Sequence, residues 1–412
     1  MTTQKLGALA EFRNGLNYTD ADNGSGLAVV GVSDFKDKVV IDTDRLQQLS
    51  LSALSKPDAL IQEGDILFVR SNGNRELIGR SVYVNAEPAM PTSHSGFTIR
   101  CRFRDRRCYP RYYAYLFRGS IIRHTLSAQG GGTNISNLNQ QILAELDVPV
   151  PDFWIQERIA GILSAYDDLI EVNQRRIAIL EEMARRLFDE WFIQPLGKRL
   201  PIPGDRLDQW RLPSGWSFST LIDTADVTMG QSPASSEYNE DIGGMPFHQG
   251  VSDFEGRFHR NRLFLRPDLT WNRNADKGDV LFSVRAPVGR IAIALESLAL
   301  GRGLCAIRDL RGQQAFLMTH LLMSFPHQDM FGGGTIYKAV TKDDVYSIPI
   351  LLPPEGLKTA FEKLASPMWE QLKTLTLANM QLRNARDLLL PKLVSGEIDV
   401  SVTQETFAEA AE

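Results

Sequence analysis

Two kinds of hydrophobic pattern alternate along the chain. The first consists of short apolar or alternating runs separated by Gly, Pro, Asn and Asp, which is typical of strands joined by irregular loops. It appears at Ile66–Val69 and Arg80–Val84 and returns at Val280–Val284 and Arg290–Ala294. Within Thr98–Arg104 the alternation is regular, so we expect apolar side chains on one face of a strand and three arginines on the other.

Helical periodicity follows each strand-rich stretch. From about Trp154 to Phe192 apolar residues recur at steps of three and four, and the same spacing recurs 202 residues later. Helices that each carry such a seam over about four heptads pair as a coiled coil. Asn173 and Asn379 are the polar interruptions of the two seams, and we predict that they fix the register of the pair. The other predicted seam residues are Leu163, Tyr166, Ile170, Ile177, Leu180, Leu187, Met368, Leu372, Leu375, Leu382 and Leu389.

The segment 193–216 is rich in Pro and Gly and is expected to link the first helix to a second strand-rich module. Equivalent exits of the helices from their modules favour an antiparallel pair with pseudo-twofold symmetry and the modules at opposite ends. The predicted fold class is therefore α+β, with two β-rich modules separated by two long helices that form an antiparallel coiled coil. The predicted parts are a first module at 1–151, a helical region at 152–194, a linker and second module at 195–353, a second helical region at 354–400, and a flexible tail at 401–412.

Short motifs repeat in the same order in the two modules. The sequence GVSDF at 31–35 recurs at 250–254, GDILF at 64–68 returns as GDVLF at 278–282, and GGGT at 130–133 returns at 332–335. The offsets fall from 219 through 214 to 202 residues. Solenoid and propeller repeats are only about 20–50 residues long, so this pattern indicates a duplicated domain. The Gly-Asp pair of the second motif is predicted to form a tight turn into a buried strand.

Size and composition describe an ordinary globular chain. With 412 residues, 43% hydrophobic and 23% charged, the sequence is expected to form two or three domains. It has no long apolar segment and no signal-peptide core, so we expect a cytoplasmic protein. Its three cysteines form no CxxC pair, so neither a disulfide framework nor a structural metal site is expected.

The net charge of −5 argues against a chain that binds nucleic acid unaided. The charge is unevenly spread, because residues 1–150 carry 17 Lys+Arg against 15 Asp+Glu, a balance of +2. Eight arginines lie within residues 100–123. Local basic density is therefore present, but partners are expected to supply part of the positive charge.

The sequence contains no recognisable catalytic machinery. It has no GxxxxGK[ST] loop, no HExxH, no Gly-x-Ser-x-Gly and no acidic-Pro-Pro-aromatic motif of the kind used by base methyltransferases. The six histidines lie at unrelated places in the two modules, whereas a duplicated active site would repeat its residues. We therefore expect no catalytic residue, no metal and no cofactor in this chain.

Candidate DNA contacts lie beyond the buried strands. The loops 69–75 and 284–290 contain Arg and Asn, which pair bidentately with guanine and adenine edges, although a plain polar surface loop explains them equally well. The GGGT segments can offer backbone N–H groups to a phosphate or serve as flexible turns. The predicted DNA-binding residues are Arg70, Asn72, Arg75, Arg80, Arg100, Gly131, Gly132, Thr133, Arg285, Arg290, Gly333, Gly334, Thr335 and Lys338.

The ordered motifs resemble a known family. The GGGT–polar–Val/Ile-Pro–helix junctions at 130–160 and 332–362, the sequence LPSGW at 212–216 and PKLVSGEI at 391–398 are similar to those of the specificity subunits of Type I restriction-modification systems. The resemblance extends from Leu6 to about Ile398. It implies a non-catalytic subunit whose two target-recognition domains each read half of a bipartite site in double-stranded DNA, and whose coiled coil sets the spacer. It also implies two docked modification (methyltransferase) subunits and additional restriction subunits.

Three other functions remain open from the sequence. The nearest is a specificity subunit of a related restriction-modification assembly that is not Type I. A stand-alone DNA-modifying enzyme, such as a fused methyltransferase, is disfavoured by the missing catalytic and cofactor motifs. A coiled-coil scaffold without nucleic-acid function is disfavoured by the arginine-bearing loops in both modules and by the family resemblance.

Overall fold

The chain forms two compact units in a computed structural model. Unit 1 comprises Met1–Ile170 with Gln381–Glu412, and unit 2 comprises Glu171–Met380. The structure describes residues 2–35, 39–54, 57–72, 77–129, 138–241, 243–326 and 340–400. None of the helices in these ranges carries an apolar stretch long enough to cross a bilayer.

Unit 1 is organised around a four-stranded antiparallel sheet with the order β2-β8-β5-β6. Strand β5 is apolar throughout and fully buried, and its ring Phe68 lies 5.1 Å from Phe117 of helix α2, which packs against the sheet. A smaller sheet, β4-β3-β7, and a two-stranded pair, β1-β9, complete the module. The bounds are β1 Thr3–Lys5, α1 Leu6–Leu9, β2 Ala10–Asn14, β3 Gly26–Val30, β4 Gln47–Ser50, β5 Ile66–Val69, β6 Ser81–Tyr83, β7 Thr92–His94, β8 Thr98–Phe103, α2 Pro110–Arg118, α3 Ser120–Gln129, α4 Gln140–Ala144 and β9 Asp147–Pro149.

Unit 2 repeats this plan. Its four-stranded sheet has the order β11-β21-β18-β19, and a pair β10-β22 takes the place of β1-β9. A five-stranded sheet, β12-β16-β13-β20-β17, and the hairpin β14-β15 are larger than the corresponding part of unit 1. The bounds are β10 Ser217–Thr220, α6 Leu221–Thr224, β11 Ala225–Met229, β12 Tyr238–Asn239, β13 Pro246–His248, β14 Phe254–Glu255, β15 Phe258–His259, β16 Leu263–Leu265, β17 Asn274–Ala275, β18 Val280–Ser283, β19 Ile291–Ile293, β20 Leu298–Leu300, β21 Leu304–Asp309, α7 Gln314–Ser324, α8 Lys342–Tyr346 and β22 Pro349–Leu352.

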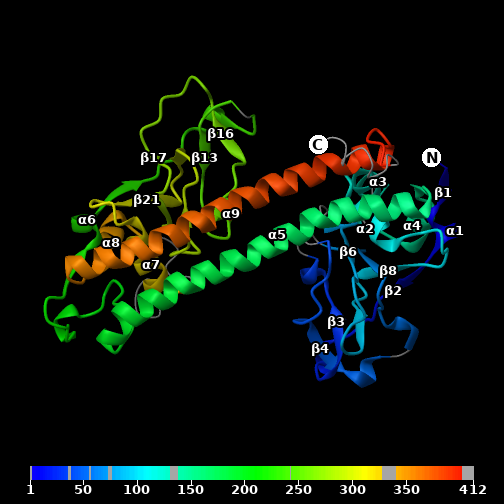
Figure 1. Cartoon of the computed structure of the whole chain (residues 1–412), viewed down its shortest axis with the longest axis horizontal. Coiled ribbons are helices and arrows are strands. Elements are labelled where there is room, and N and C mark those ends of the chain that lie inside the picture. The colour runs from blue at the N-terminus through cyan, green and yellow to red at the C-terminus, as the bar shows by residue number, and fades with distance from the viewer. Residues whose placement is uncertain are drawn as a thin grey trace, which may run out of the picture. The chain divides into compact units, whose positions relative to one another are not determined.

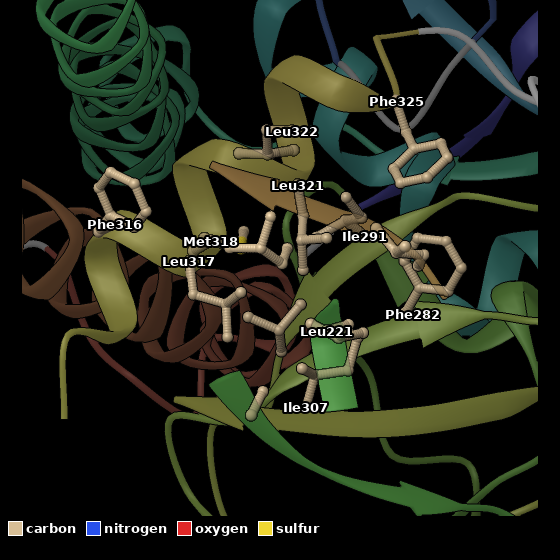
Figure 2. Packing of buried hydrophobic residues seen from close by; sticks show 14 of the residues in the cluster. Leu221, Phe282, Ile291, Ile307, Phe316, Leu317, Met318, Leu321, Leu322 and Phe325 are labelled. Atoms are coloured by element: carbon tan, nitrogen blue, oxygen red, sulfur yellow. The ribbon is translucent and has the colours of Figure 1, made fainter. Parts of the chain in front are cut away.

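Helix α7 connects the sheet of unit 2 to the long helices. Figure 2 shows its leucines, including Leu317 and Leu321, directed toward Ile307 and Phe282 of the sheet, while Phe316 points away toward the long helices. The Phe316 ring lies 5.5 Å from Phe188. The apolar residues of α7 are thus divided between two neighbours, which is why the helix is buried on nearly every side.

The repeated Gly-Asp motif has one structural explanation in both units. Gly64 and Gly278 adopt φ values of +90° and +93°, which glycine tolerates best, and each precedes a buried strand. The following Asp65 is buried and accepts two hydrogen bonds of 2.7 Å from Arg102, which raise the pKa of that guanidinium. In unit 2, Asp279 and Arg308 form the corresponding pair at 2.7 Å. The predicted turn is confirmed, and its aspartate is an anchor for an arginine on the neighbouring strand.

The long helices α5, Phe153–Phe188, and α9, Glu355–Ser395, pair in opposite directions. Within unit 2, Phe188 of α5 lies 5.5 Å from Phe361 of α9, and Asn173 Nδ2 donates to Asn379 Oδ1 at 2.9 Å. Residues late in α5 therefore lie beside residues early in α9, and the two helices are antiparallel, as Figure 1 also shows. The predicted fold class, with an internal repeat and an antiparallel helix pair, is confirmed. The finer domain boundaries stay a prediction, although both helices lie within their predicted regions.

The predicted seam residues are shielded from solvent. All thirteen predicted seam residues are buried or half-buried, and both asparagines are less than 5% exposed. At the end of α5 the deepest residues are Phe188 and Phe192 rather than Leu187, because a π-helical turn at Asp189–Ile193 follows and the helix there packs against α7. The heptad pattern therefore predicts the buried face of each helix well and the module contact less well.

Candidate nucleic-acid interface

The first predicted reading loop meets two other segments at one edge of the unit 1 sheet. Arg70 follows strand β5, and its backbone N–H donates to Phe97 O at 2.8 Å in the loop before β8. Its carbonyl accepts from Leu138 N–H at 2.9 Å, just after the GGGT segment. Three segments that are far apart in sequence are thus joined by backbone bonds, and all three are candidates for contact with DNA.

Unit 2 forms the same edge with equivalent bonds. Val284 N–H donates to Gly303 O at 2.9 Å, and Val284 O accepts from Val340 N–H at 2.9 Å. Arg70 therefore corresponds to Val284. An alignment of the two sequence motifs pairs Arg70 with Arg285. This alignment is wrong by one residue, because the backbone hydrogen bonds define which positions of the two units are equivalent.

Arg80 and Arg290 are a second equivalent pair. Arg80 O accepts from Val69 N–H at 2.8 Å, and Arg290 O accepts from Ser283 N–H at 2.9 Å. Both side chains are half-buried at the start of the outer strand of the sheet. Because the same side chain stands at the same position in both modules, we infer a shared role in the scaffold or in contact with the DNA backbone. Sequence-specific reading of two different half-sites would call for different side chains.

An exposed aromatic ring accompanies Arg70. Phe97 is 63% exposed, although its backbone is held by Arg70, whose Nη1 lies 3.5 Å from Gly96 O. Exposed rings beside cations suit stacking on bases or insertion at a base step. Asn72 lies two residues further along, half-buried. Sequence reasoning missed Phe97; the signal was an aromatic residue after glycine in a loop between two strands.

A pocket of about 410 Å³ lies at the same edge of unit 2. Its walls include the exposed Arg285 and Arg302, together with Tyr238 and Gln249, whose Nε2 donates to the Tyr238 hydroxyl at 3.0 Å. Within the described residues, neither guanidinium forms an ion pair with a carboxylate. Cations, an amide and a phenol together offer the donors and acceptors that base edges require.

The pocket depends on a close approach that glycine permits. A Cβ atom at Gly303 would lie 2.4 Å from Gln249 O, and one at Gly301 would lie 2.7 Å from Gln249 Cα. Only glycine fits at these positions, so the Gly301-Arg302-Gly303 sequence presses its backbone against the Gln249 loop. Arg302 between them is left exposed. Arg302 was not predicted as a contact from the sequence, although an arginine between two glycines indicates a cation on a tightly packed loop.

The arginine-rich segment 100–123 is largely engaged within unit 1. The prediction that Arg100 contacts DNA is wrong: its side chain is 3% exposed, and its Nη1 donates to Asp58 O at 2.8 Å and to Leu60 O at 2.9 Å. Arg104 pairs with Glu11 and, through its hydrogen bond, lowers the pKa of that carboxyl. Together with the Arg102–Asp65 pair, these contacts show that the basic face of strand β8 stabilises the module.

Eight predicted contacts lie outside the described residues. They are Arg75, Gly131, Gly132, Thr133, Gly333, Gly334, Thr335 and Lys338. The remaining ones, apart from Arg100, lie on or beside the edges described above.

Four buried histidines are structural. Burial lowers the pKa of His94, His259 and His320 to about 3, and that of His248 also falls below its ordinary value. His320 Nε2 accepts from Leu351 N–H at 3.0 Å, so this ring serves the packing of α7 on strand β22. Across the described residues, no group of three His, Cys, Asp or Glu side chains could hold a metal ion.

Comparison with known proteins gives a consistent result. A family model described as Type I restriction modification DNA specificity domain matches residues 3–182 and 213–360. The chain is 28% identical over 403 residues to the putative type I restriction enzyme MjaX specificity subunit of Methanocaldococcus jannaschii, covering 95% of this chain and 92% of that protein. It is 26% identical over 306 residues to the MjaIX specificity subunit of the same organism, covering 70% of this chain and 69% of that protein. The crystal structure of a Type-I restriction-modification system S subunit from M. genitalium has a TM-score of 0.53 at 15% identity, covering 95% of each chain, which shows a shared fold.

Proposed function

Because this chain belongs to the family of Type I restriction modification DNA specificity domains, we propose that it recognises a bipartite DNA sequence, one half with each unit. The matched segments fall in both modules, at 3–182 and 213–360, which fits two readers in one chain. The target is double-stranded DNA, and the place of action is the cytoplasm.

One observation supports the proposal above all. The two sheet edges have the same backbone bonds but present different side chains: Arg70 and Phe97 in unit 1, Arg285 and Arg302 in unit 2. A fixed backbone with variable side chains suits the reading of two different half-sites. Identical half-sites would instead call for identical edges.

The chain's role is recognition without catalysis, and no cofactor is required of it. The buried histidines are neutral and engaged in packing, and the described pockets contain arginine rather than acid–base pairs. Methylation and cleavage would then belong to other subunits of the complex. Two modification subunits dock on the helices, and restriction subunits join them. Positive charge on these partner subunits compensates for the net charge of −5 on this chain when the complex binds DNA.

The helices supply the spacer of the bipartite site. An α-helix has a rise of about 1.5 Å per residue, so the length of the paired segment sets a distance that DNA can match in base pairs. The buried Asn173–Asn379 bond favours one register of the pair and thus one spacer length.

The experiment that tests the function is co-expression with the modification subunit, followed by mapping of methylated bases on genomic DNA. The expected result is one motif with two short specific halves separated by an unread spacer. A continuous methylated motif would indicate a different restriction-modification assembly, and methylation independent of this chain would overturn the proposal.

A further inference from the structure

Gln249 of unit 2 stands at a position where unit 1 has a glycine. Gln249 comes directly after β13, which runs parallel to β20, and Gly31 comes directly after β3, which runs parallel to β7. Gln249 N–H donates to Asp253 Oδ2 at 3.0 Å, and Gly31 N–H donates to Asp34 Oδ2 at 2.8 Å. Gln249 is therefore the residue equivalent to Gly31, although the repeated motif pairs Gly31 with Gly250. Because unit 1 closes this turn without a side chain, the glutamine side chain is not needed to build it.

The backbone of Gln249 is fixed on both sides, whereas its side chain is exposed. The N–H is bonded to Asp253, and the carbonyl oxygen accepts from Gly303 N–H at 3.1 Å. Gly303 has room there only because it lacks a Cβ atom, which would lie 2.4 Å from Gln249 O. The side chain of Gln249 is exposed at the rim of the 410 Å³ pocket. An exposed polar side chain thus extends from a backbone that has little freedom to move.

Tyr238 sets the direction of the Gln249 amide. Gln249 Nε2 donates to the Tyr238 hydroxyl at 3.0 Å. The backbone of Tyr238 is paired with Leu265 of β16, and its ring lies 4.9 Å from the ring of Phe247, which is only 1% exposed. Strand pairing and ring packing together hold the phenol in place. The amide is consequently oriented before any ligand binds, which lowers the entropy cost of contact.

The bond to Tyr238 leaves a donor and an acceptor side by side on the amide. A glutamine amide has two N–H groups and one carbonyl oxygen. One N–H is used by Tyr238, and within the described part of the chain no donor is bonded to Oε1. The free N–H and the carbonyl match adenine, whose major-groove edge presents the N7 acceptor beside the N6 amino donor. Guanine presents two acceptors at this edge, cytosine a donor and thymine an acceptor, so none of them satisfies both groups.

The neighbouring cations direct DNA toward this amide. Arg285 and Arg302 are exposed at the same pocket, and in the part of unit 2 that the structure describes neither forms an ion pair with a carboxylate. Their charges attract the phosphate backbone to the edge that carries Gln249. The amide then supplies what the two cations cannot, because a guanidinium only donates hydrogen bonds.

We propose that Gln249 reads an adenine in the half-site of unit 2, with Tyr238 as its positioning residue. This inference rests on the proposed function and goes beyond it by assigning a type of base to one side chain. It predicts an A·T pair in that half-site whose identity depends on Gln249, in addition to any guanine read by an arginine.

The first arm of the test measures binding by the complex assembled with the modification subunit. Competing duplexes carry the methylated motif with each base pair changed in turn. For the wild type, changing the A·T pair should weaken binding about 5- to 150-fold. Gln249→Ala should bind that duplex and the original almost equally well and should keep its discrimination at every other position. Gln209→Ala, which truncates an exposed glutamine of the linker, should show the wild-type profile.

The second arm changes the chemistry of the reading group instead of removing it. A glutamate only accepts hydrogen bonds, so Gln249→Glu should change the preferred base at the same position from adenine to cytosine, which donates from N4. Tyr238→Phe keeps the ring against Phe247 and removes only the hydroxyl. It should reduce discrimination at that position about two- to tenfold. A residue that only stabilised the turn would weaken the binding of all duplexes alike.

The proposal is overturned if Gln249→Ala keeps full discrimination at every position, or weakens all duplexes equally while the Tm of the chain is unchanged. It also fails if the affected base pair is not A·T or if Gln249→Glu keeps the preference for adenine. Should Gln249→Ala lower the Tm, Gln249→Glu and Tyr238→Phe decide the question. A continuous wild-type motif would count against the proposed function, whereas the role of Gln249 would still be judged base by base within that motif.

Discussion

Phe97 and Gly303 occupy equivalent positions in the two modules, since each carbonyl accepts the N–H of the residue that follows the central buried strand. The residues before them are Gly96 and Arg302. In unit 1 the side chain offered at this edge is therefore an exposed ring, and in unit 2 it is an exposed cation one residue earlier. Rings stack on bases and tolerate many sequences, whereas arginine discriminates through hydrogen bonds to guanine.

Replacing Arg302 by Ala should therefore affect one half-site only. We expect relaxed methylation at a base of the half-site read by unit 2, with a cost of about 1–3 kcal/mol in discrimination, and an unchanged half-site for unit 1. The matched change in the other module is Phe97→Ala. Sequencing of methylated DNA from cells that carry each variant would show the effect, and equal losses at both half-sites in either variant would refute the assignment.

The buried histidines make stability depend on pH. Burial holds the pKa of His320 at about 3, whereas an unfolded histidine titrates near 6.5, so below about pH 6.5 the unfolded chain binds the additional proton. Stability should accordingly be complete above pH 6.5 and fall as the pH decreases toward 3. Protonation of Nε2 would also break its bond from Leu351 N–H.

The change from pH 7 to pH 5 should cost about 1–2 kcal/mol for each such histidine. The urea midpoint of the wild type should decrease over this range, and His320→Gln should flatten the dependence by about one proton. A wild-type midpoint that is constant between pH 7 and pH 5 would contradict this account.

At the scale of elements, the pairing of α5 with α9 contains a buried polar bond at its centre. Asn173 and Asn379 are 4% and 3% exposed and bond to each other at 2.9 Å in a seam that is otherwise mostly apolar. A buried amide without a partner costs about 1–3 kcal/mol, whereas an apolar pair in its place costs little or stabilises. Such a bond favours one register over others that would separate the two amides.

Asn173→Leu should consequently destabilise the chain by about 1–3 kcal/mol, and Asn173→Leu with Asn379→Leu should restore or exceed the wild-type stability. The double variant should also tolerate more than one register, which would appear as methylated motifs with more than one spacer. Urea denaturation measures the first effect and motif mapping the second. Additive losses in the single and double variants would exclude the bond as the cause.

The elements were largely predictable and the interface was less so, for different physical reasons. Heptad spacing identified the seam, because burial on one face of a helix leaves a periodic trace in the sequence. The alternation in Thr98–Phe103 likewise identified a strand, but alternation cannot say what covers its polar face. Arg100 proved to be buried beneath the carbonyls of Asp58 and Leu60, some forty residues away in sequence.

Register was the other point that sequence could not provide. An alignment of the repeated motifs pairs Val69 with Val284. In the structure Val69 lies opposite Thr98, and Ser283 lies opposite Leu304. The residue of unit 2 that is equivalent to Val69 is therefore Ser283, one residue before Val284. In the structure the loops before β8 and β21 lie beside the starts of the candidate loops 69–75 and 284–290, and this neighbourhood makes Phe97 and Arg302 candidates for DNA contact. Non-local backbone bonds determine which side chains share an edge, and a single sequence does not contain them.

At the scale of the whole molecule, the duplication and the helices together predict how the recognised sequence responds to helix length. The segments Gln174–Leu180 and Leu372–Ala378 face each other, because they are bounded on one side by the bonded pair Asn173 and Asn379. Removing both deletes one heptad from each helix, preserves the seam and retains the asparagine bond. Seven residues correspond to about 10 Å of helix, or about three base pairs of B-DNA.

The spacer of the methylated motif should therefore shorten by about three base pairs while both half-sites keep their bases. Deleting only Gln174–Leu180 is the control, since it leaves seven residues of α9 unmatched and should reduce methylation without defining a new spacer. Genomic methylation mapping distinguishes the cases directly. An active paired deletion with the original spacer would show that the helices do not set the distance, and the modification subunits would then have to fix the separation of the half-sites.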